Sequence, residues 1–318
     1  MALSDMQKFE EYARNMAWET IDQKIALFNT ASRGCIVLRS GRNVGDITTE
    51  TFWNKIPGLM RRRDAYGSGA LNPTTMSEDK ESSVKVAGGT LPVLFEPQQF
   101  TWIKENPEDA GILFGEQLAE GILADYVNSA LGVVSAAIGN NAEAVHNAGA
   151  VSMTRGEFVK GAAKFGDRAG DIAAWAMHST PMHSLFEANV ANNEQLFNIG
   201  NLNVMQDGFG RIFVVTDAPD LVVSGTPNKF HTLGLTAEAV VIEDNGDLAT
   251  ATETKTGQNN IQRVIQAEYT FNAKVKGYSW DKANGGASPD DAALRTGANW
   301  DLKRDSIKNT AGVKIITQ

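Results

Sequence analysis

The 318-residue sequence has a single cysteine, Cys35, and this scarcity removes several classes of protein at once. One thiol cannot form an intramolecular disulfide or a cysteine-rich metal site, and it suits a reducing compartment. No base lies near Cys35 in the sequence, which favours a buried thiol over a nucleophile. Because 42% of the residues are hydrophobic, the chain can still bury a sizeable core, in two domains or in one elaborated domain.

Positive charge is also in short supply, since 29 Lys and Arg face 38 Asp and Glu and give a net charge of −9. This balance argues against a dedicated nucleic-acid binder, although a local basic face stays open. The N-terminus lacks the basic start and apolar block of a signal peptide, and no stretch is apolar and long enough to span a bilayer. We therefore expect no membrane as a partner.

The densest positive cluster is Arg61, Arg62 and Arg63, and three interpretations of it compete. It can be a solvated run, or it can form ion pairs with acidic patches on neighbouring subunits. Phosphate contact is the weakest of the three, because neither a Gly-Lys-Ser/Thr loop nor interleaved aromatic residues accompany it.

Catalytic motifs are missing as well. His178 and His183 lie across a predicted turn and form no His-Glu-x-x-His pattern. Ser179 and Ser184 lack the Gly-x-Ser-x-Gly setting of an exposed nucleophile, so turn and capping roles are favoured for all four. We predict no enzyme activity, no catalytic residue, no metal site and no cofactor. A soluble hydrolase that uses His178 or His183 is the alternative from another class.

What the sequence does have is one long apolar periodicity between Asn106 and Gly139. Asn106 suits an N-cap and Pro107 the first helical position, and Gly139-Asn140 predicts a left-handed stop. A helix of this length spans roughly 45–50 Å, and we judge it too polar to cross a membrane. The pattern predicts a long core helix or a structural spine. Its apolar positions recur at helical spacing: Leu118, Ala119, Ile122, Leu123, Tyr126, Val127, Ala130, Leu131, Val134, Ala137 and Ile138.

The N-terminal third combines a helix with an irregular segment. Residues 4–28 carry an apolar stripe and predict a helix that packs either on its own domain or, as an arm, on a neighbouring subunit. From residue 31 to 104 only short strands are indicated, and Gly88-Gly89 predicts a hairpin between the last two. So long a stretch with little core of its own is unusual, yet its aromatic residues do not suit disorder. We expect an extended arm that becomes ordered against partner subunits.

The second half alternates strands and turns. Thr154 and Glu157 match a capping box, and 172–177 predicts a strand followed by a helix from Pro181 to about Asn189. Asp207–Gly210 predicts a hairpin turn between strands 204–206 and 211–215. With further strands at 230–235 and 239–243, we expect a compact α+β unit from about 166 to 247. A long strand within 261–280 and closing strands at 299–301 and 313–316 complete the chain.

Several segments, in this order along the chain, together resemble the major capsid protein of tailed bacteriophages, with its Hong Kong ninety-seven-type fold. The resemblance covers almost the whole chain, with the long helix between its parts, although each motif alone is weak. The segments that carry it are Thr51–Asn54, Arg62–Asp64, Trp175–Ser179, Pro181–Leu185, Phe209–Pro219, Trp300–Asp305 and Ala311–Val313.

The resemblance implies an α+β fold with four parts. Residues 1–46 would be an N-terminal arm and 47–105 an extended β-hairpin loop over an adjacent subunit. Residues 106–165 and 255–318 would form a peripheral domain around the spine helix, and 166–254 an axial domain. No long helical segment precedes the arm, so no fused scaffolding domain is expected.

The same resemblance implies a structural function in the virion capsid, which assembles in the host bacterial cytoplasm. Copies of the chain would self-assemble as hexamers and pentamers into an icosahedral shell that encloses double-stranded DNA without sequence-specific binding. A portal would be a further partner, and separate scaffolding or decoration proteins are open. An encapsulin-like cellular nanocompartment with the same fold is the alternative.

Five residues are the candidates for contacts between subunits: Trp53, Arg61, Arg62, Arg63 and Phe95. All five lie in the segment that would form the extended loop. Lys80 and Lys85 lie where some members of the family form a covalent link, but nothing identifies an asparagine and an acidic partner. We therefore predict no such bond.

Overall fold

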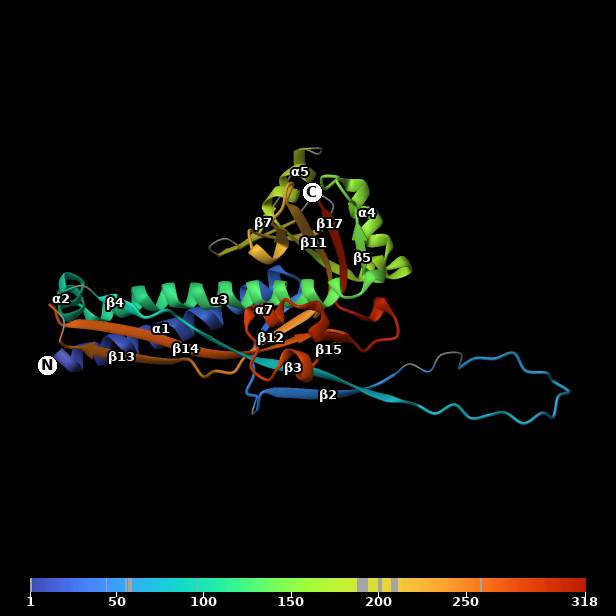
Figure 1. The fold of residues 1–318 in the computed structure, drawn as a ribbon, viewed down its shortest axis with the longest axis horizontal. Coiled ribbons are helices and arrows are strands. Elements are labelled where there is room, and N and C mark those ends of the chain that lie inside the picture. The colour runs from blue at the N-terminus through green and yellow to red at the C-terminus, as the bar shows by residue number, and fades with distance from the viewer. Residues whose placement is uncertain are drawn as a thin grey trace.

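A computed structural model describes residues 2–43, 45–54, 56, 59–95, 97–187, 194–199, 202–206, 211–257 and 259–318. It is an elongated α+β structure, with a long hairpin leaving one side (Figure 1). The helices are α1 (Ala2–Ala31), α2 (Pro97–Glu105), α3 (Pro107–Gly139), α4 (Arg155–Ala163), α5 (Ser179–Glu187), α6 (Lys282–Gly285) and α7 (Asp291–Leu294). Short 3₁₀ helices are η1 (Ala142–Ala144), η2 (Gly166–Asp171), η3 (Pro219–Leu221), η4 (Gly297–Asn299) and η5 (Ile307–Asn309).

The strands fall into three sheets, described below. The first nine are β1 (Ile36–Ser40), β2 (Ile47–Trp53), β3 (Glu78–Gly89), β4 (Val93–Phe95), β5 (Val145–Asn147), β6 (Ile172–Met177), β7 (Glu194–Ile199), β8 (Leu202–Gln206) and β9 (Ile212–Thr216). The others are β10 (Val222–Val223), β11 (Lys229–Thr236), β12 (Val240–Asp244), β13 (Ala249–Lys255), β14 (Gln262–Val275), β15 (Tyr278–Trp280), β16 (Trp300–Leu302) and β17 (Gly312–Thr317).

The long strand β14 organises the first sheet. This seven-stranded sheet has the order β1-β12-β14-β3-β2, and β13 and β4 also pair with β14. Ile265, Ala267, Tyr269 and Phe271 are buried while the residues between them are more exposed, the period of two expected for a strand with one covered face. The covering helix is α3, whose Tyr126 ring packs against Tyr269 and Phe271.

The second sheet lies beyond the C-terminal half of α3 (Figure 1). It is eight-stranded, with the order β5-β17-β11-β6-β9-β8-β7 and with β10 paired to β11. Successive residues of β6 point to opposite faces, so Ala174 and Ala176 join the core around α3, whereas Trp175 and Met177 join a second cluster that includes Phe158 of α4. Helices therefore cover both faces of this sheet. The remaining strands, β15 and β16, pair with each other.

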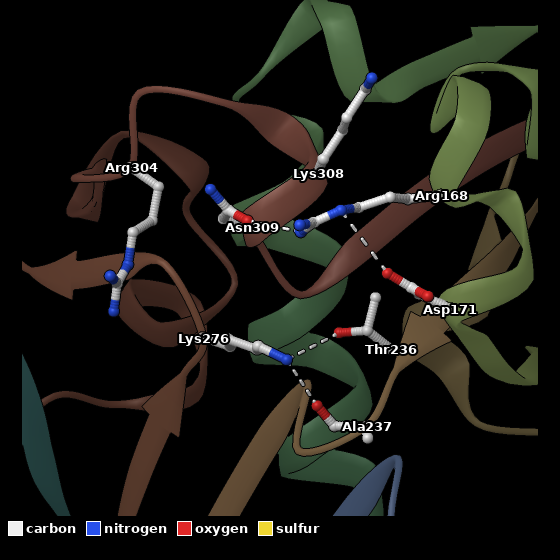
Figure 2. Close-up of a pocket in the computed structure, with 8 residues that line it drawn as sticks. All are labelled: Arg168, Asp171, Thr236, Ala237, Lys276, Arg304, Lys308 and Asn309. Carbon is white, nitrogen blue, oxygen red and sulfur yellow. Dashed lines mark hydrogen bonds and ion pairs between the residues drawn. The ribbon is translucent and has the colours of Figure 1, made fainter. Parts of the chain in front are cut away.

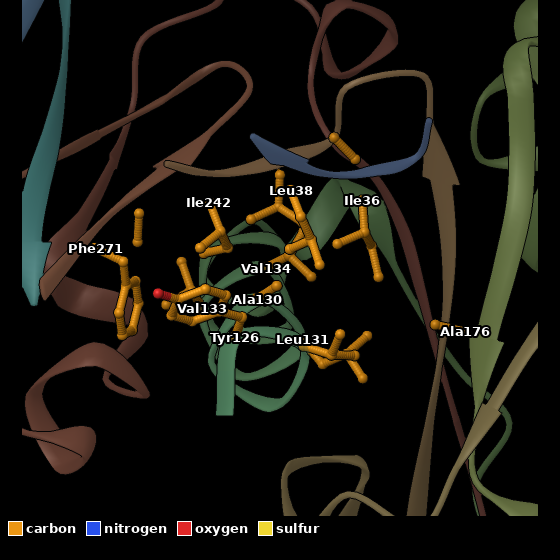
Figure 3. Close-up of a cluster of buried hydrophobic side chains, with 14 of the residues drawn as sticks. Ile36, Leu38, Tyr126, Ala130, Leu131, Val133, Val134, Ala176, Ile242 and Phe271 are labelled. Carbon is orange, nitrogen blue, oxygen red and sulfur yellow. The ribbon is translucent and has the colours of Figure 1, made fainter. Parts of the chain in front are cut away.

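The spine helix α3 changes character along its length. Its first half is amphipathic, but in its second half Ala130, Leu131, Val133 and Val134 are all buried. Figure 3 shows why, because side chains from β1, β12, β14 and β6 approach this stretch from several directions. A helix that is apolar all round is stable only when it is enclosed in this way. The predicted long core helix is thus confirmed.

The structure corrects the prediction that this helix is too polar for a bilayer. By length and composition α3 is long and apolar enough, with a mean hydropathy of 1.4 in an 18-residue window. However, 67% of that window is buried inside the protein, which is the setting of a core helix.

Helix α1 packs along α3 of its own chain, the first of the two alternatives for residues 4–28. The contact is close because Gly111 and Gly115 of α3 face it. A Cβ atom on Gly115 would lie 2.5 Å from the carbonyl oxygen of Ala13, and one on Gly111 would lie 2.8 Å from that of Phe9. Two glycines one helical turn apart thus allow the two backbones to approach.

Two predictions from glycine are wrong. Gly88-Gly89 makes no hairpin, because β3 and β4 both pair with β14 rather than with each other. Gly88 instead leaves room for the Tyr269 ring, which would lie 2.6 Å from a Cβ atom there. The left-handed stop at Gly139-Asn140 is also absent, since Asn140 stays helical at φ −74°, ψ −14° and its amide donates to Ala136 and Ala137.

Other predicted elements are confirmed, with one change of partner. The strand 172–177, the paired strands β8 and β9, and the long strand β14 all form. The turn 207–210 lies outside the described residues. Strand β12, expected in the compact unit 166–247, pairs instead with β1 and β14 of the first sheet. The segment 31–104 also has more core than predicted, because β1 and β3 both belong to that sheet.

Candidate inter-subunit surfaces

The projecting hairpin grows directly out of the first sheet. Strand β3 pairs with β14 from Gly89 to Val84, and β2 pairs with β3 from Ile47 to Trp53. Val84 and Val86 are buried in the core, whereas the outer part of β3 extends past the end of its pairing with β14. The base of the hairpin is therefore anchored by a continuous ladder.

Charged side chains fix the direction in which the hairpin leaves the body. Arg304, from the C-terminal segment, donates from Nε and Nη2 to Oε1 of Glu81 on β3, each at 2.7 Å. Its guanidinium carbon also lies 3.6 Å from the ring centroid of Phe52 on β2. Lys274 of β14 pairs with Glu50 of β2 as well. Since Glu81 is 6% exposed, its charge depends on Arg304 for compensation.

The tip of the hairpin, unlike its base, is fully exposed. Every residue from 59 to 77 is exposed. Ser77 at its edge accepts hydrogen bonds from Asn54, and the other bonds found there are local, with the Tyr66 amide donating to Oδ1 of Asp64 at 3.0 Å. Trp53 at the end of β2 is 60% exposed, Met60 88% and Tyr66 99%. Other large apolar side chains of the tip are uncovered too: Leu59, Leu71 and Met76. So much apolar surface in one segment indicates a surface that another molecule covers.

The three arginines lie in this tip. Arg61, Arg62 and Arg63 are exposed, and none of them pairs with a carboxylate in the part of the chain that the structure describes. Their charge is therefore available to a second molecule. Together with Trp53, they make four of the five predicted contact residues part of one projecting element.

Phe95 stands apart from the other four. It is half-buried, and its ring packs against Phe9 of α1 and Phe114 of α3 at centroid distances of 5.6 and 6.5 Å. These contacts belong to a small cluster that joins α1, α3 and β14. Phe95 thus has a packing role inside its own chain that the sequence did not indicate.

The histidine invoked for a hydrolase caps a helix. His178 Nδ1 accepts from the amide of Thr180 at 3.1 Å, while Nε2 lies 3.4 Å from Oδ1 of Asp217. The amide of Ser179 also donates to Asp217, and a hydrogen bond from the Ser179 side chain is the main reason why the pKa of Asp217 is lowered. These groups satisfy the first turn of α5, so the predicted capping role is confirmed for His178. His183 is exposed on α5.

Cys35 and the acidic side chains are the remaining candidates for a reactive or metal-binding group. The Cys35 thiol is buried, as predicted, and burial raises its pKa to about 12, so it stays protonated at neutral pH. Among the residues that the structure describes, no group of three His, Cys, Asp or Glu side chains is arranged to hold a metal ion. The pocket drawn in Figure 2 is lined mainly by basic and polar side chains that hold partners within the chain, with Arg168 contacting Asn309 and Asp171, and Lys276 contacting Thr236 and Ala237. The feature that stands out is accordingly the surface of the hairpin.

A family model described as major capsid protein 13-like (Gp13-like) matches residues 5–314. The chain belongs to this family. It is a major capsid protein of a tailed phage, a structural component of the virion capsid, with the Hong Kong ninety-seven-like fold. Shell formation by many copies of the major capsid protein follows from this membership. The nanocompartment and hydrolase alternatives are not favoured.

A solved phage capsid supports the fold, and two others are given with it for comparison. The capsid of cyanophage Pam1 superposes with a TM-score of 0.51 at 12% identity, covering 89% of this chain and 88% of that chain. The capsid of Ralstonia phage GP4 has a TM-score of 0.47 at 11% identity, covering 76% and 83%. Mycobacterium phage Bobi has 0.45 at 11%, covering 91% and 90%. No curated protein sequence matches the chain.

Two structural features of the major capsid protein were not predicted from the sequence. The clamp of Arg304, Glu81 and Phe52 joins segments more than two hundred residues apart, and no local pattern signals it. The close α1–α3 contact did leave a signal, because Gly111 and Gly115 are spaced by one helical turn in an otherwise apolar helix.

Proposed function

We propose that the chain assembles as hexamers and pentamers into an icosahedral shell that encloses double-stranded DNA. A portal would be a further partner, with separate scaffolding or decoration proteins where the phage encodes them. The net charge of −9 supports containment of the DNA by confinement rather than by tight binding. This proposal rests on the resemblance of the sequence and on membership of the capsid family.

The observation that carries the proposal is the contrast within the hairpin. Its base is fixed by a ladder and by Arg304, whereas its tip, residues 59–77, exposes large apolar side chains and three arginines. A rigidly aimed but uncovered tip gains stability only when another subunit covers it. Trp53, Arg61, Arg62 and Arg63 are the residues we assign to that contact.

The proposed division of the chain rests on the resemblance to the capsid family. Residues 1–46 would be the arm segment and 47–105 the extended loop. Residues 106–165 and 255–318 would form the peripheral domain, and 166–254 the axial domain around the capsomer axes. The pairing of β12 and β13 with β14 supports moving these two strands to the peripheral domain. In the same way, the pairing of β17 with β11 and β5 supports moving β5 and β17 to the axial domain.

The test is assembly of the purified chain, followed by light scattering for mass and by negative-stain microscopy on the same fractions. The intact chain should give closed shells or rings of five and six. A variant in which a Gly-Ser linker replaces residues 59–77 should fold but stay as small species. A monomer that never assembles, even with a co-expressed scaffolding protein, would contradict the proposal, as would normal shells from the shortened variant.

A further inference from the structure

The turn between α2 and α3 forms an acidic surface at the end of the molecule opposite the hairpin tip (Figure 1). Glu105, Glu108 and Asp109 are all exposed there, and Lys104 is the only basic residue between positions 102 and 113. Glu108 accepts a hydrogen bond from the Tyr12 hydroxyl at 3.1 Å. Glu105 and Asp109 have no ion-pair partner among the residues described. We call this surface the acidic end.

Apolar side chains lie among the carboxylates of the acidic end. Ile112 follows Glu108 and Leu113 follows Asp109 by four residues, so each apolar residue shares a face of α3 with an acidic one. Both are exposed, as is Trp102 of α2. Beneath them, buried Ile103 and Ala110 pack with the Phe9 cluster, which makes the surface firm. Acidic and apolar groups are thus presented together on a rigid support.

The hairpin tip presents the complementary arrangement. Leu59 and Met60 are exposed and apolar, and Arg61, Arg62 and Arg63 follow directly, with Asp64 as the only acidic residue between 59 and 77. In a chain with an excess of negative charge, this is the densest cationic run of the sequence, and none of its three arginines forms an ion pair among the residues described. Apolar contact with the acidic end would bury surface on both sides, and the opposite charges would fix its register.

The two surfaces cannot meet within one chain, because they lie at opposite ends of its long axis (Figure 1). A contact between them therefore joins two copies head to tail. Repetition of such a heterologous contact closes into a ring when the rotation between copies allows it. The partner that fits the charge, the apolar groups and the geometry is a second copy of this chain.

We propose that residues 59–66 of one subunit dock on the acidic end of the next subunit, with Arg61–Arg63 facing Glu105 and Asp109. The proposal rests on the proposed function, in that it assumes that the hairpin tip is an assembly contact, and it adds where that tip binds. Because the paired charges lie partly open to solvent, salt should weaken the contact.

Charge reversal on each side, alone and together, tests the docking. One variant carries Arg61→Glu, Arg62→Glu and Arg63→Glu, another carries Glu105→Arg and Asp109→Arg, and a third combines all five changes. Glu108 is kept because it bonds Tyr12. Assembly yield is measured by light scattering against ionic strength, and folding of each variant is checked by thermal unfolding. Each separate reversal should lower the yield about tenfold or more at low salt, and the combined variant should recover most of it.

Glu143→Arg serves as the matched control. Glu143 is exposed just beyond the other end of α3, so its reversal changes the overall charge without touching the acidic end, and the yield should stay within about twofold. If the combined variant fails to recover while the Gly-Ser replacement of residues 59–77 still abolishes assembly, the docking site is overturned and the proposed function stands. If the arginine-reversed variant forms normal shells that retain less DNA, the arginines contact nucleic acid instead. That outcome would overturn the docking as well.

Discussion

The base and the tip of the hairpin belong to one β-ribbon, yet they are stabilised in opposite ways. At the base, Val84 and Val86 are buried, and Arg304 compensates the buried charge of Glu81. At the tip, Tyr66 and Met60 are almost fully exposed, and the Tyr66 amide bonds only its near neighbour Asp64. The base is thus complete within one chain, whereas the exposed side chains of the tip would be covered only if the proposed contact between subunits forms.

The largest expected effect comes from breaking the clamp at the base. Arg304→Met keeps an apolar stem beside Phe52 but leaves Glu81 as an unpaired charge in a buried site. The free energy of unfolding should fall by about 3 kcal/mol, as measured by urea unfolding of dissociated subunits.

Lys303→Met is the control for the clamp, because the neighbouring Lys303 forms a partly exposed pair with Asp301 at 3.6 Å. It should change stability by less than about 0.5 kcal/mol. Equal losses in the two variants would mean that Arg304 does not hold the base.

A pair of aromatic truncations separates folding from assembly. Phe95→Ala removes a ring that packs against Phe9 and Phe114, so unfolding should become easier by about 2 kcal/mol. Trp53→Ala removes an exposed ring and should leave stability within about 0.5 kcal/mol while reducing the yield of shells. The two measurements are chemical unfolding and light scattering. Loss of stability in Trp53→Ala comparable to that in Phe95→Ala would place Trp53 in the fold rather than at an interface.

The close packing of α1 on α3 can be tested by adding a methyl group at their contact. Gly115→Ala places a methyl group against the carbonyl oxygen of Ala13, and the resulting shift should lower stability by about 1–2 kcal/mol. Gly121→Ala in the same helix meets nothing within 4 Å and should instead raise stability, by up to about 1 kcal/mol. Thermal unfolding of both variants checks the difference in sign, and the same sign for both would contradict the close packing.

The smallest effect concerns pH and a site remote from the hairpin. Burial lowers the pKa of His231 on β11 from its ordinary 6.5 to about 4, with the nearby Lys314 charge acting in the same direction. Between these values the unfolded chain binds more protons than the folded one, so stability falls as pH drops below 6.5. From pH 6.5 to 5, stability of the native sequence should fall about 1 kcal/mol more than that of His231→Gln. Parallel pH profiles for the two would contradict the burial of the imidazole.

Local patterns accounted for much of the fold. Apolar periodicity predicted α3 and β14, and turn residues predicted the pairing of β8 with β9, because these features depend on neighbours in sequence. Partners across the chain could not be predicted in the same way. Gly88 suggested a turn but makes room for Tyr269, and β12 crosses to the other sheet, since both outcomes depend on residues far along the chain.

The candidate contact residues could also be predicted only in part from the sequence. Exposure of Trp53 and the arginines fits a loop that was expected to lack a core of its own. Phe95 lies in the same segment, but its packing is decided by α1 and α3, which the local sequence does not reveal. Composition can therefore indicate a segment that lacks a core of its own. Only the structure shows which residues of that segment pack within the chain and which are left exposed.

Hydrogen exchange of the hairpin, measured on dissociated subunits and on assembled shells, tests the central claim most directly. The account predicts that amides of residues 83–89 are protected in both states, whereas those of residues 59–77 are protected only in shells. Protection of the tip in free subunits, or a tip that exchanges equally fast in shells, would contradict it.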